Sequence, residues 1–198
     1  MSSKIKKQNS FQINQKIFCP WHGLGTIISI EEKMPDQKFY KIRYLKENLS
    51  SFVPIAKVKE FGLRDLSTKD IINRMFCVLE KPFRIGKGMW SKRAQEYDTK
   101  MSSGSILLTT EIVRDLFITS KDPNRSYSER VIYETALSRV VSEAAIVLGL
   151  SENDIESKII TILSKSMSPT VKDAPKNQVD DFKDDLESFS DDYDSDSS

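Results

Sequence analysis

The stretch GTIISIEEKMPDQKFYKIRY, residues 25–44, decides the fold of the first half of the chain. Its two runs, Gly25–Glu32 and Phe39–Tyr44, are rich in β-branched and aromatic residues, which are typical of β-strands. Between them, Pro35-Asp36 is a turn signal. The stretch therefore predicts two strands joined by a turn.

Similar short runs lie on either side, at Lys16–Cys19 and Leu49–Val53, and turn residues separate them. Four or five short strands between residues 11 and 66 are too few for an extended sandwich. We therefore predict a small, strongly bent SH3-like or Tudor-like β-barrel. Such a barrel leaves an edge strand that can pair with a partner.

Helical patterning replaces the strand pattern after Ser67. The fourth predicted helix begins at a capping box, Ser126 to Glu129, and ends before Gly149. Apolar spacing and punctuation predict five helices: Thr68–Glu80, Met89–Met101, Ile106–Thr119, Ser126–Leu148 and one starting at Ser151. The chain is thus predicted to be an α+β multidomain protein, with a barrel at 11–66, an all-α domain at 67–165, and disordered segments at 1–10 and 166–198.

The net charge of +1 hides an asymmetry between the ends of the chain. Residues 171–198 carry ten acidic residues against three lysines, a net charge of −7, which leaves +8 on residues 1–170. A basic folded part favours a polyanion partner, and the acidic tail is able to compete for the same surface.

Few residues are suited to catalysis or to metal binding. The chain has one histidine, His22, and two cysteines, Cys19 and Cys77, which are too few for a metal site or a histidine-dependent catalytic triad. No phosphate-binding glycine loop is present. We therefore predict a binding protein without cofactor or metal, not an enzyme.

The sequence also indicates a compartment. It contains no apolar run of about 18 residues and no apolar segment after the charged N-terminus, so we predict no membrane span and no secretion. The two distant cysteines fit a reducing compartment. A cytoplasmic protein is expected.

The stretch KPFRIGKGMWSKR, residues 81–93, is the strongest candidate for function. It is basic, contains no acidic residue, and places Trp90 at a predicted helix start. A flat apolar ring among cations suits insertion beside a stacked base, with the cations on the flanking phosphates. The predicted DNA-binding residues are Trp90, Arg84, Lys87, Lys92 and Arg93. Alternatively, Trp90 is a core residue of the helical domain.

Four motifs resemble one known family. FQINQKIFCPWHGLGTI (11–27) and FGLRDL (61–66) are similar to the RNA polymerase interacting domain of CarD/CdnL proteins and of transcription-repair coupling factors. MWSKRAQEYDTKMSSG (89–104) and SYSERVIYETALSRVVSE (126–143) resemble the helical DNA-binding domain of the CarD branch, which coupling factors lack. The resemblance covers roughly residues 11 to 165.

The resemblance implies a bacterial, non-enzymatic transcription regulator. Its barrel would pair with a strand of the RNA polymerase β subunit, and its helical domain would reach promoter DNA at the upstream edge of the −10 region. Trp90 would wedge into the minor groove and hold the open complex. We assign the polymerase contacts to Lys33, Lys41, Arg43 and Phe52. Phe52 stands where the family commonly has a basic residue. The protein is expected to be monomeric and to associate with the nucleoid through polymerase.

Two other functions stay open. The helical half of an adaptor would anchor Trp90 in a protein pocket, and an RNA-binding module would use the same basic stretch. The wedge hypothesis predicts that most of the Trp90 ring is exposed in the free protein. It also predicts that Trp90 is more exposed than Leu116, Leu137 or Val140.

Overall fold

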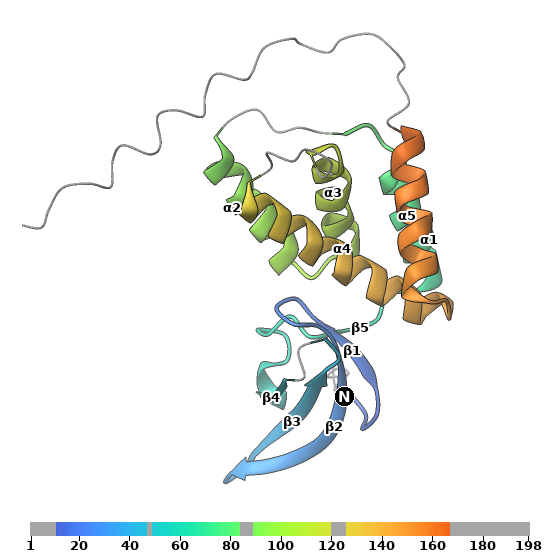
Figure 1. Ribbon diagram of the computed structural model, residues 1–198. Helices are drawn as coiled ribbons and strands as arrows, with labels where there is room; N and C mark the ends of the chain where they lie inside the picture. The colour runs from blue at the N-terminus through green and yellow to red at the C-terminus, as the bar shows by residue number, and fades with distance from the viewer. Residues whose placement is uncertain (1–10, 47–48, 84–88, 120–125, 167–198) are drawn as a thin grey trace, which may run out of the picture. The chain divides into compact units, whose positions relative to one another are not determined.

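The computed structural model describes residues 11–46, 49–83, 89–119 and 126–166 (Figure 1). Within these ranges an antiparallel five-stranded sheet precedes five α-helices, which confirms the predicted α+β organisation. Both belong to one structural unit of the chain. The predicted disordered segments, 1–10 and the tail after Ser166, lie outside the described residues.

The strands of the sheet are antiparallel and follow the order β4-β3-β2-β1-β5. We call residues 11–65 the sheet module. Alternation along β3 turns Tyr40, Ile42 and Tyr44 inward, where each is at most 2% exposed. The strands are β1 Lys16–Cys19, β2 Gly23–Met34, β3 Gln37–Tyr44, β4 Ser50–Pro54 and β5 Arg64–Asp65.

The sheet differs from the prediction in its strand lengths and in one extra strand. Strand β2 begins at Gly23 and continues past Glu32 to Met34, and β3 begins at Gln37, so both are longer than predicted and meet at the turn where Asp36 has a positive φ of 62°. No residue range was predicted for strand β5, because two residues are too few to show the alternation of apolar and polar residues that marks a strand. The Tudor-like character of the sheet and the domain boundary at residue 66 stay predictions.

Close packing between β2 and β3 depends on Gly25. A Cβ at this position would lie 2.7 Å from Ile42 Cγ2. Any side chain there would therefore collide with Ile42 and crowd the Tyr44 ring on β3, which explains the glycine at the start of the predicted run.

The helices agree with the predicted ranges to within two residues at each described end. Local signals set these ends: the Thr68 side chain accepts from Ile71 N, the Ser126 side chain accepts from Glu129 N, and Gly149 ends α4 with a left-handed φ of 70°. We call residues 69–166 the helical module. Its helices are α1 Lys69–Leu79, α2 Trp90–Ser102, α3 Ile106–Phe117, α4 Tyr127–Leu148 and α5 Glu152–Ser166.

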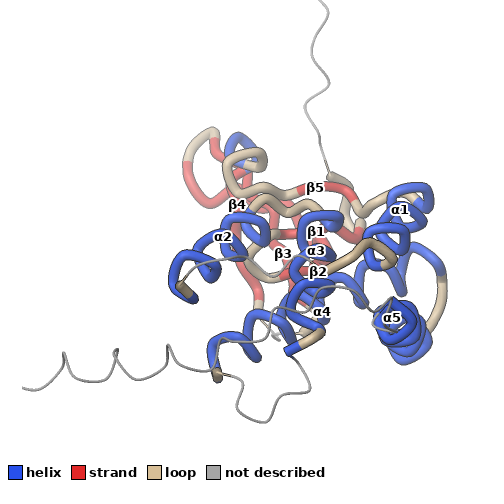
Figure 2. Tube along the Cα trace, turned by 90° about the horizontal axis from the view of Figure 1, so that it is seen from above, coloured by secondary structure: helices blue, strands red, loops and turns tan. Residues whose placement is uncertain are grey.

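The helical module has its own core, and α1 and α5 lie side by side within it (Figure 2). The long helix α4 buries Tyr133, Val140 and Ala144, as predicted, whereas Leu137 and Val147 are partly buried. It also buries the whole run 140–145, more than one helix face, because α4 contacts other helices and strand β2. The helix α4 therefore joins the two modules.

Three further features of the described residues concern the cysteines, possible metal ligands and membrane-spanning helices. Cys19 is buried, Cys77 is exposed, and both are free thiols. Among the described residues no cluster of three or more potential metal ligands occurs. In the same part of the chain, no helix is long and apolar enough to cross a membrane.

Candidate functional site

The four predicted polymerase contacts share the outer face of the sheet. Lys41 and Phe52 are register partners on β3 and β4, and Arg43 follows two residues after Lys41, so alternation places all three on one face. Lys33 reaches them from β2, with its Nζ 2.9 Å from the centroid of the Phe52 ring. Lys41 Nζ lies 5.6 Å from the same centroid. We call these four residues the Phe52 patch.

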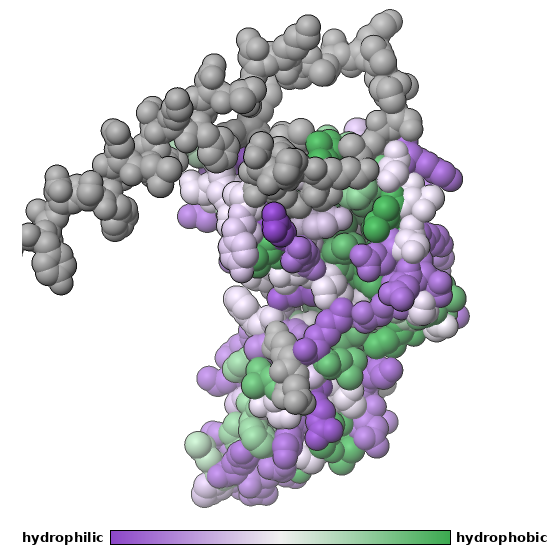
Figure 3. Space-filling model, in the orientation of Figure 1, coloured by the Kyte–Doolittle hydropathy of each residue, from purple (hydrophilic) through white to green (hydrophobic). Residues whose placement is uncertain are grey.

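The Phe52 patch lies at an edge of the sheet, because β4 is the terminal strand in the order. Its Phe52 ring is partly exposed and is covered by two ammonium groups, a cation–π arrangement. The lower end of the molecule in Figure 3, where the β2–β3 hairpin ends, carries mostly hydrophilic residues together with the exposed Met34. The patch therefore offers a strand edge, one aromatic ring and positive charge to a partner.

A second surface forms where α2 and α4 begin. Trp90 is the first residue of α2, and its indole Nε1 donates a 2.9 Å hydrogen bond to Ser128 Oγ near the start of α4. The Trp90 ring lies 6.4 Å from the ring of Tyr97 and 5.3 Å from the Arg93 guanidinium. Met89, which precedes Trp90, is 75% exposed, and Tyr127, which precedes Ser128, is 79% exposed. We call Met89, Trp90, Arg93, Tyr127 and Ser128 the Trp90 surface.

The exposure of Trp90 corrects one prediction. The wedge hypothesis predicts that most of the ring is exposed, whereas the Trp90 residue is partly buried and packs against the helical core. Trp90 is more exposed than Leu116 and Val140, whereas Leu137 falls in the same partly buried class. The physical reason is that Tyr97 and Ser128 hold one side of the indole against α2 and α4. One side of the ring supports the fold, and the remainder is available for contact.

The predicted DNA-binding cations differ in their surroundings. Lys92 is exposed, while Arg93 is partly buried and its Nε is buried without a hydrogen-bond partner among the described residues. Arg84 and Lys87 lie outside the described residues. The structure thus brings Trp90, Lys92 and Arg93 together at the start of α2 and does not bring the Phe52 patch to them.

Tyr97 lies beneath the Trp90 surface, and the pKa of its phenol is clearly shifted. Burial raises the pKa of the Tyr97 phenol above 10.0, the nearby Asp115 raises it further, and the Arg93 guanidinium opposes both. The positive charge of Arg93 therefore lowers the pKa of Tyr97, the buried residue that packs against Trp90, and it also adds positive charge to the Trp90 surface.

Sequence reasoning missed the contact between the modules. Arg64 on β5 forms two hydrogen bonds to Glu143 on α4, of 2.6 and 2.8 Å, and Ser67 N and Oγ each donate to Glu143 Oε1 at 2.8 Å. Arg64 Nε also donates to Gly104 O at 2.8 Å, just after α2. Glu143 is fully buried, so its charge is compensated inside the protein. The sequence did contain one signal of this contact, because Glu143 lies between the apolar core positions Val140 and Ala144, where a charged residue needs a buried partner.

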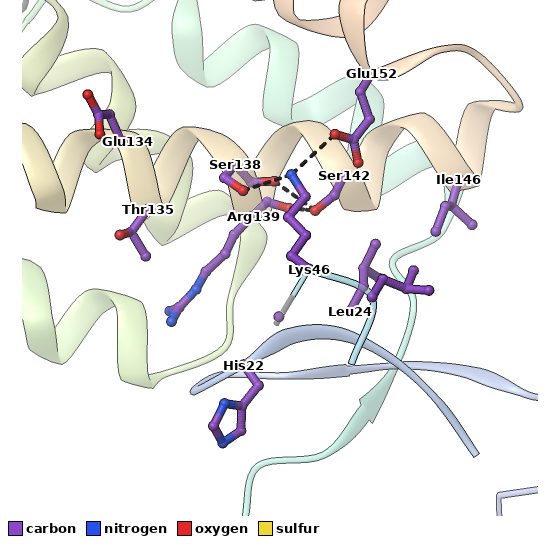
Figure 4. Close-up of a pocket in the computed structure, with 12 residues that line it drawn as sticks. His22, Leu24, Lys46, Glu134, Thr135, Ser138, Arg139, Ser142, Ile146 and Glu152 are labelled. Carbon is purple, nitrogen blue, oxygen red and sulfur yellow. Dashed lines mark hydrogen bonds and ion pairs between the residues drawn. The ribbon is translucent and has the colours of Figure 1, made fainter. Parts of the chain in front are cut away.

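Beside this contact a pocket of about 460 Å³ lies between the sheet module and α4 (Figure 4). Lys46 crosses it, donating to Ser138 Oγ at 2.8 Å and pairing with Glu152 at 3.2 Å. Arg139 donates to the backbone oxygen of Trp21 at 2.9 Å. Lys46 and Arg139 thus form bonds between the sheet module and the helical module.

Both modules match known protein families. The CarD-like/TRCF RID domain matches residues 11–67, and the C-terminal domain of CarD matches residues 74–160. The chain belongs to the CarD family. The two matches together account for both modules of this CarD-type protein in the order that the sequence motifs predicted.

A relative supports the assignment along most of the chain. This CarD-type protein is 27% identical over 150 residues to a protein of Bacillus subtilis (strain 168) named "Putative transcription factor YdeB". The aligned region covers 74% of this chain and 98% of that protein. The resemblance drawn from the motifs is thereby confirmed at the level of the family.

Proposed function

We propose that the protein regulates transcription by bridging RNA polymerase and promoter DNA. The sheet module binds the polymerase β subunit, and the helical module binds DNA at the upstream edge of the −10 region, where Trp90 acts as a minor-groove wedge. The observation that carries the proposal is the Trp90 surface, where a partly exposed indole is held at a helix start among cations. Membership of the CarD family supports the same assignment.

Strand pairing supports the role given to the sheet module. The terminal strand β4 can add a strand from the polymerase through its main chain. The Phe52 patch lies on the face of that strand and adds an apolar ring with two lysines nearby. Phe52 thus supplies packing, and Lys33 and Lys41 supply the charge that the family commonly places at the Phe52 position.

The wedge suits DNA that is already opening. Unstacking a base step costs a few kcal/mol, and this cost is lowest at the edge of a melted region. Because Tyr97 and Ser128 hold the Trp90 ring, little side-chain freedom is lost when the ring is inserted. Lys92 and Arg93 supply phosphate contacts with little sequence preference. The protein acts without catalysis, as a cytoplasmic monomer bound to polymerase.

The test measures polymerase binding and open-complex lifetime on the same variants. Trp90→Ala is expected to bind polymerase normally and to shorten the lifetime of the promoter open complex. Phe52→Asp is expected to lose polymerase binding and, with it, any effect on the lifetime. Ile160→Ala, on the exposed side of α5, is the control. A Trp90→Ala protein that prolongs the open complex as well as the parent would contradict the proposal.

One observation favours a second candidate. Met89 and Tyr127, the chain neighbours of Trp90 and Ser128, are exposed large hydrophobic residues, and such a surface also suits a protein pocket. An adaptor of this kind would bind its protein partner with little dependence on salt. Weakening of the Trp90-dependent contact by salt therefore separates DNA from a protein partner.

A further inference from the structure

The starts of α2 and α4 lie together, and a second aromatic residue, Tyr127, belongs to the same helix start as the partner of Trp90. Tyr127 is the first residue of α4, and the next residue, Ser128, accepts the hydrogen bond from Trp90 Nε1. The Tyr127 side chain is 79% exposed, whereas Trp90 is partly buried. The more accessible ring of this surface is therefore Tyr127.

We propose that Tyr127 is a second DNA contact, which stacks on an unpaired base of the melted promoter strand next to the step held by Trp90. This inference rests on the proposed DNA-binding function and extends it to a residue outside the basic stretch 81–93. It assigns different roles to the two rings. Trp90 holds the edge of the duplex, and Tyr127 holds a base that has left the stack.

The restraint on Trp90 supports this division. Its indole packs on the helical core and is bonded to Ser128, so only part of the ring can face a ligand. Tyr127 precedes the residue that makes this bond, so the backbone of α4 fixes where its side chain begins relative to the indole. A stacking contact needs an open ring face, and every base offers one, so Tyr127 would contribute affinity without sequence preference.

Charge favours a nucleic acid over an apolar protein partner at this surface. Lys92 on α2 and Arg130 on α4 are exposed, each within three residues of one of the two rings. Arg93 lies over the Trp90 ring at 5.3 Å and keeps a buried Nε without a partner among the described residues. The nearby acid Glu129 is engaged, since its Oε1 accepts from Thr119 Oγ1. Cations on both helix starts match the phosphates that flank a melted base.

The experiment uses the full chain bound to polymerase on a promoter whose melted strand carries 2-aminopurine, a base whose fluorescence falls on stacking. We compare the parent with Tyr127→Ala and Tyr127→Phe, and Val131→Ala, one turn further along α4 and also exposed, is the matched control. Tyr127→Ala is expected to lose the quenching at one probe position and to shorten the open-complex lifetime about tenfold. Tyr127→Phe keeps the ring and is expected to behave as the parent, as is Val131→Ala.

Two results distinguish failure of this inference from failure of the proposed function. If Trp90→Ala shortens the lifetime and Tyr127→Ala changes neither quenching nor lifetime, the role of Tyr127 is overturned and the wedge stands. If Trp90→Ala, Lys92→Ala and Tyr127→Ala all leave the open complex unchanged while polymerase still binds, DNA contact itself is overturned. Equal melting temperatures of the Tyr127 variants and the parent establish that the fold is retained.

Discussion

Arg64 and Arg93 both lie over an aromatic ring, but their hydrogen bonding differs. The Arg64 guanidinium is 4.2 Å from the centroid of Phe18, and its three nitrogens donate to Glu143, to Gly104 O and to Asp65 O. The Arg93 guanidinium is 5.3 Å from the Trp90 ring, and its Nε is buried without a partner among the described residues. Arg64 therefore engages four of its five N–H donors inside the protein, whereas Arg93 has a buried Nε that is unpaired within the described part of the chain.

This difference separates a structural arginine from one suited to ligand binding. A guanidinium that uses four of its five donors inside the protein, two of them on a buried carboxylate, is poorly placed to bind a phosphate. The Arg93 residue is partly exposed beside the Trp90 ring, so the accessible part of its guanidinium is placed to bind a phosphate oxygen. Of these two arginine–aromatic pairs, the pair at Trp90 is therefore the better suited to the proposed DNA contact.

The largest expected effect is on stability, at the intermodule contact. Arg64→Ala should lower the free energy of unfolding by about 3 to 5 kcal/mol, because it leaves the fully buried Glu143 without its countercharge. Arg93→Ala should change the free energy of unfolding by no more than about 1 kcal/mol. Urea unfolding of both variants measures the difference, and equal losses would remove the distinction between the two arginines.

A smaller loss of stability is expected for Trp90→Ala. The indole is partly buried and packs on the helical core, so its removal should cost about 1 to 3 kcal/mol, between a surface and a core substitution. Ser128→Ala removes the bond to Nε1 alone and should cost about 1 kcal/mol. Thermal unfolding of the two variants checks the order. A Trp90→Ala protein as stable as the parent would show that the ring does not support the fold.

The salt dependence of DNA binding should also differ between variants of Arg93 and variants of Arg64. Each of Lys92→Ala and Arg93→Ala is expected to reduce the slope of log K against log salt concentration by about one. Arg64→Lys should leave this slope unchanged, since Arg64 is engaged with Glu143. Titration of fluorescent DNA at several salt concentrations measures the slopes. An unchanged slope in Arg93→Ala would exclude a phosphate contact by Arg93.

The smallest effect is expected at high pH. The folded-state pKa of Tyr97 is raised, so the protonated phenol is favoured by folding. Its contribution to stability is fully present below the unfolded pKa of about 10 and is lost as pH rises through the folded pKa. Because Arg93 lowers this pKa, Arg93→Ala should raise the pKa of Tyr97 further. An ultraviolet absorbance titration, with Tyr97→Phe as the control, measures the shift, and a fall in pKa would contradict it.

Local signals made most of the fold predictable. The helix starts at Thr68 and Ser126 carry capping side chains, and Gly149 supplies the left-handed residue after α4, so these ends follow from a few neighbouring residues. Strand β5 has two residues and exists because it pairs with β1. Pairing between distant segments leaves no periodic trace, and for this reason β5 was missed.

The candidate site was predictable only in part. A basic stretch around Trp90 indicated the surface on α2, and the structure adds Ser128 and Tyr127, which lie 38 and 37 positions further along the chain. Nothing in a periodic pattern brings two helix starts together, because tertiary packing does so. The bond between Arg64 and Glu143 spans 79 positions and was hidden for the same reason.

The hydrogen bond from Arg64 to Gly104 attaches the end of α2 to the sheet module, so the length of α2 fixes the distance of Trp90 from that module. The helix carries Trp90 at its start and ends at Ser102, and the sheet module fastens the chain two residues later. Thirteen residues at 1.5 Å each hold the indole about 20 Å from that attachment. Adding one residue to α2 would move the ring by about 1.5 Å along the axis and turn it by about 100°. The length of this helix therefore sets both the reach of the indole and the direction in which it points.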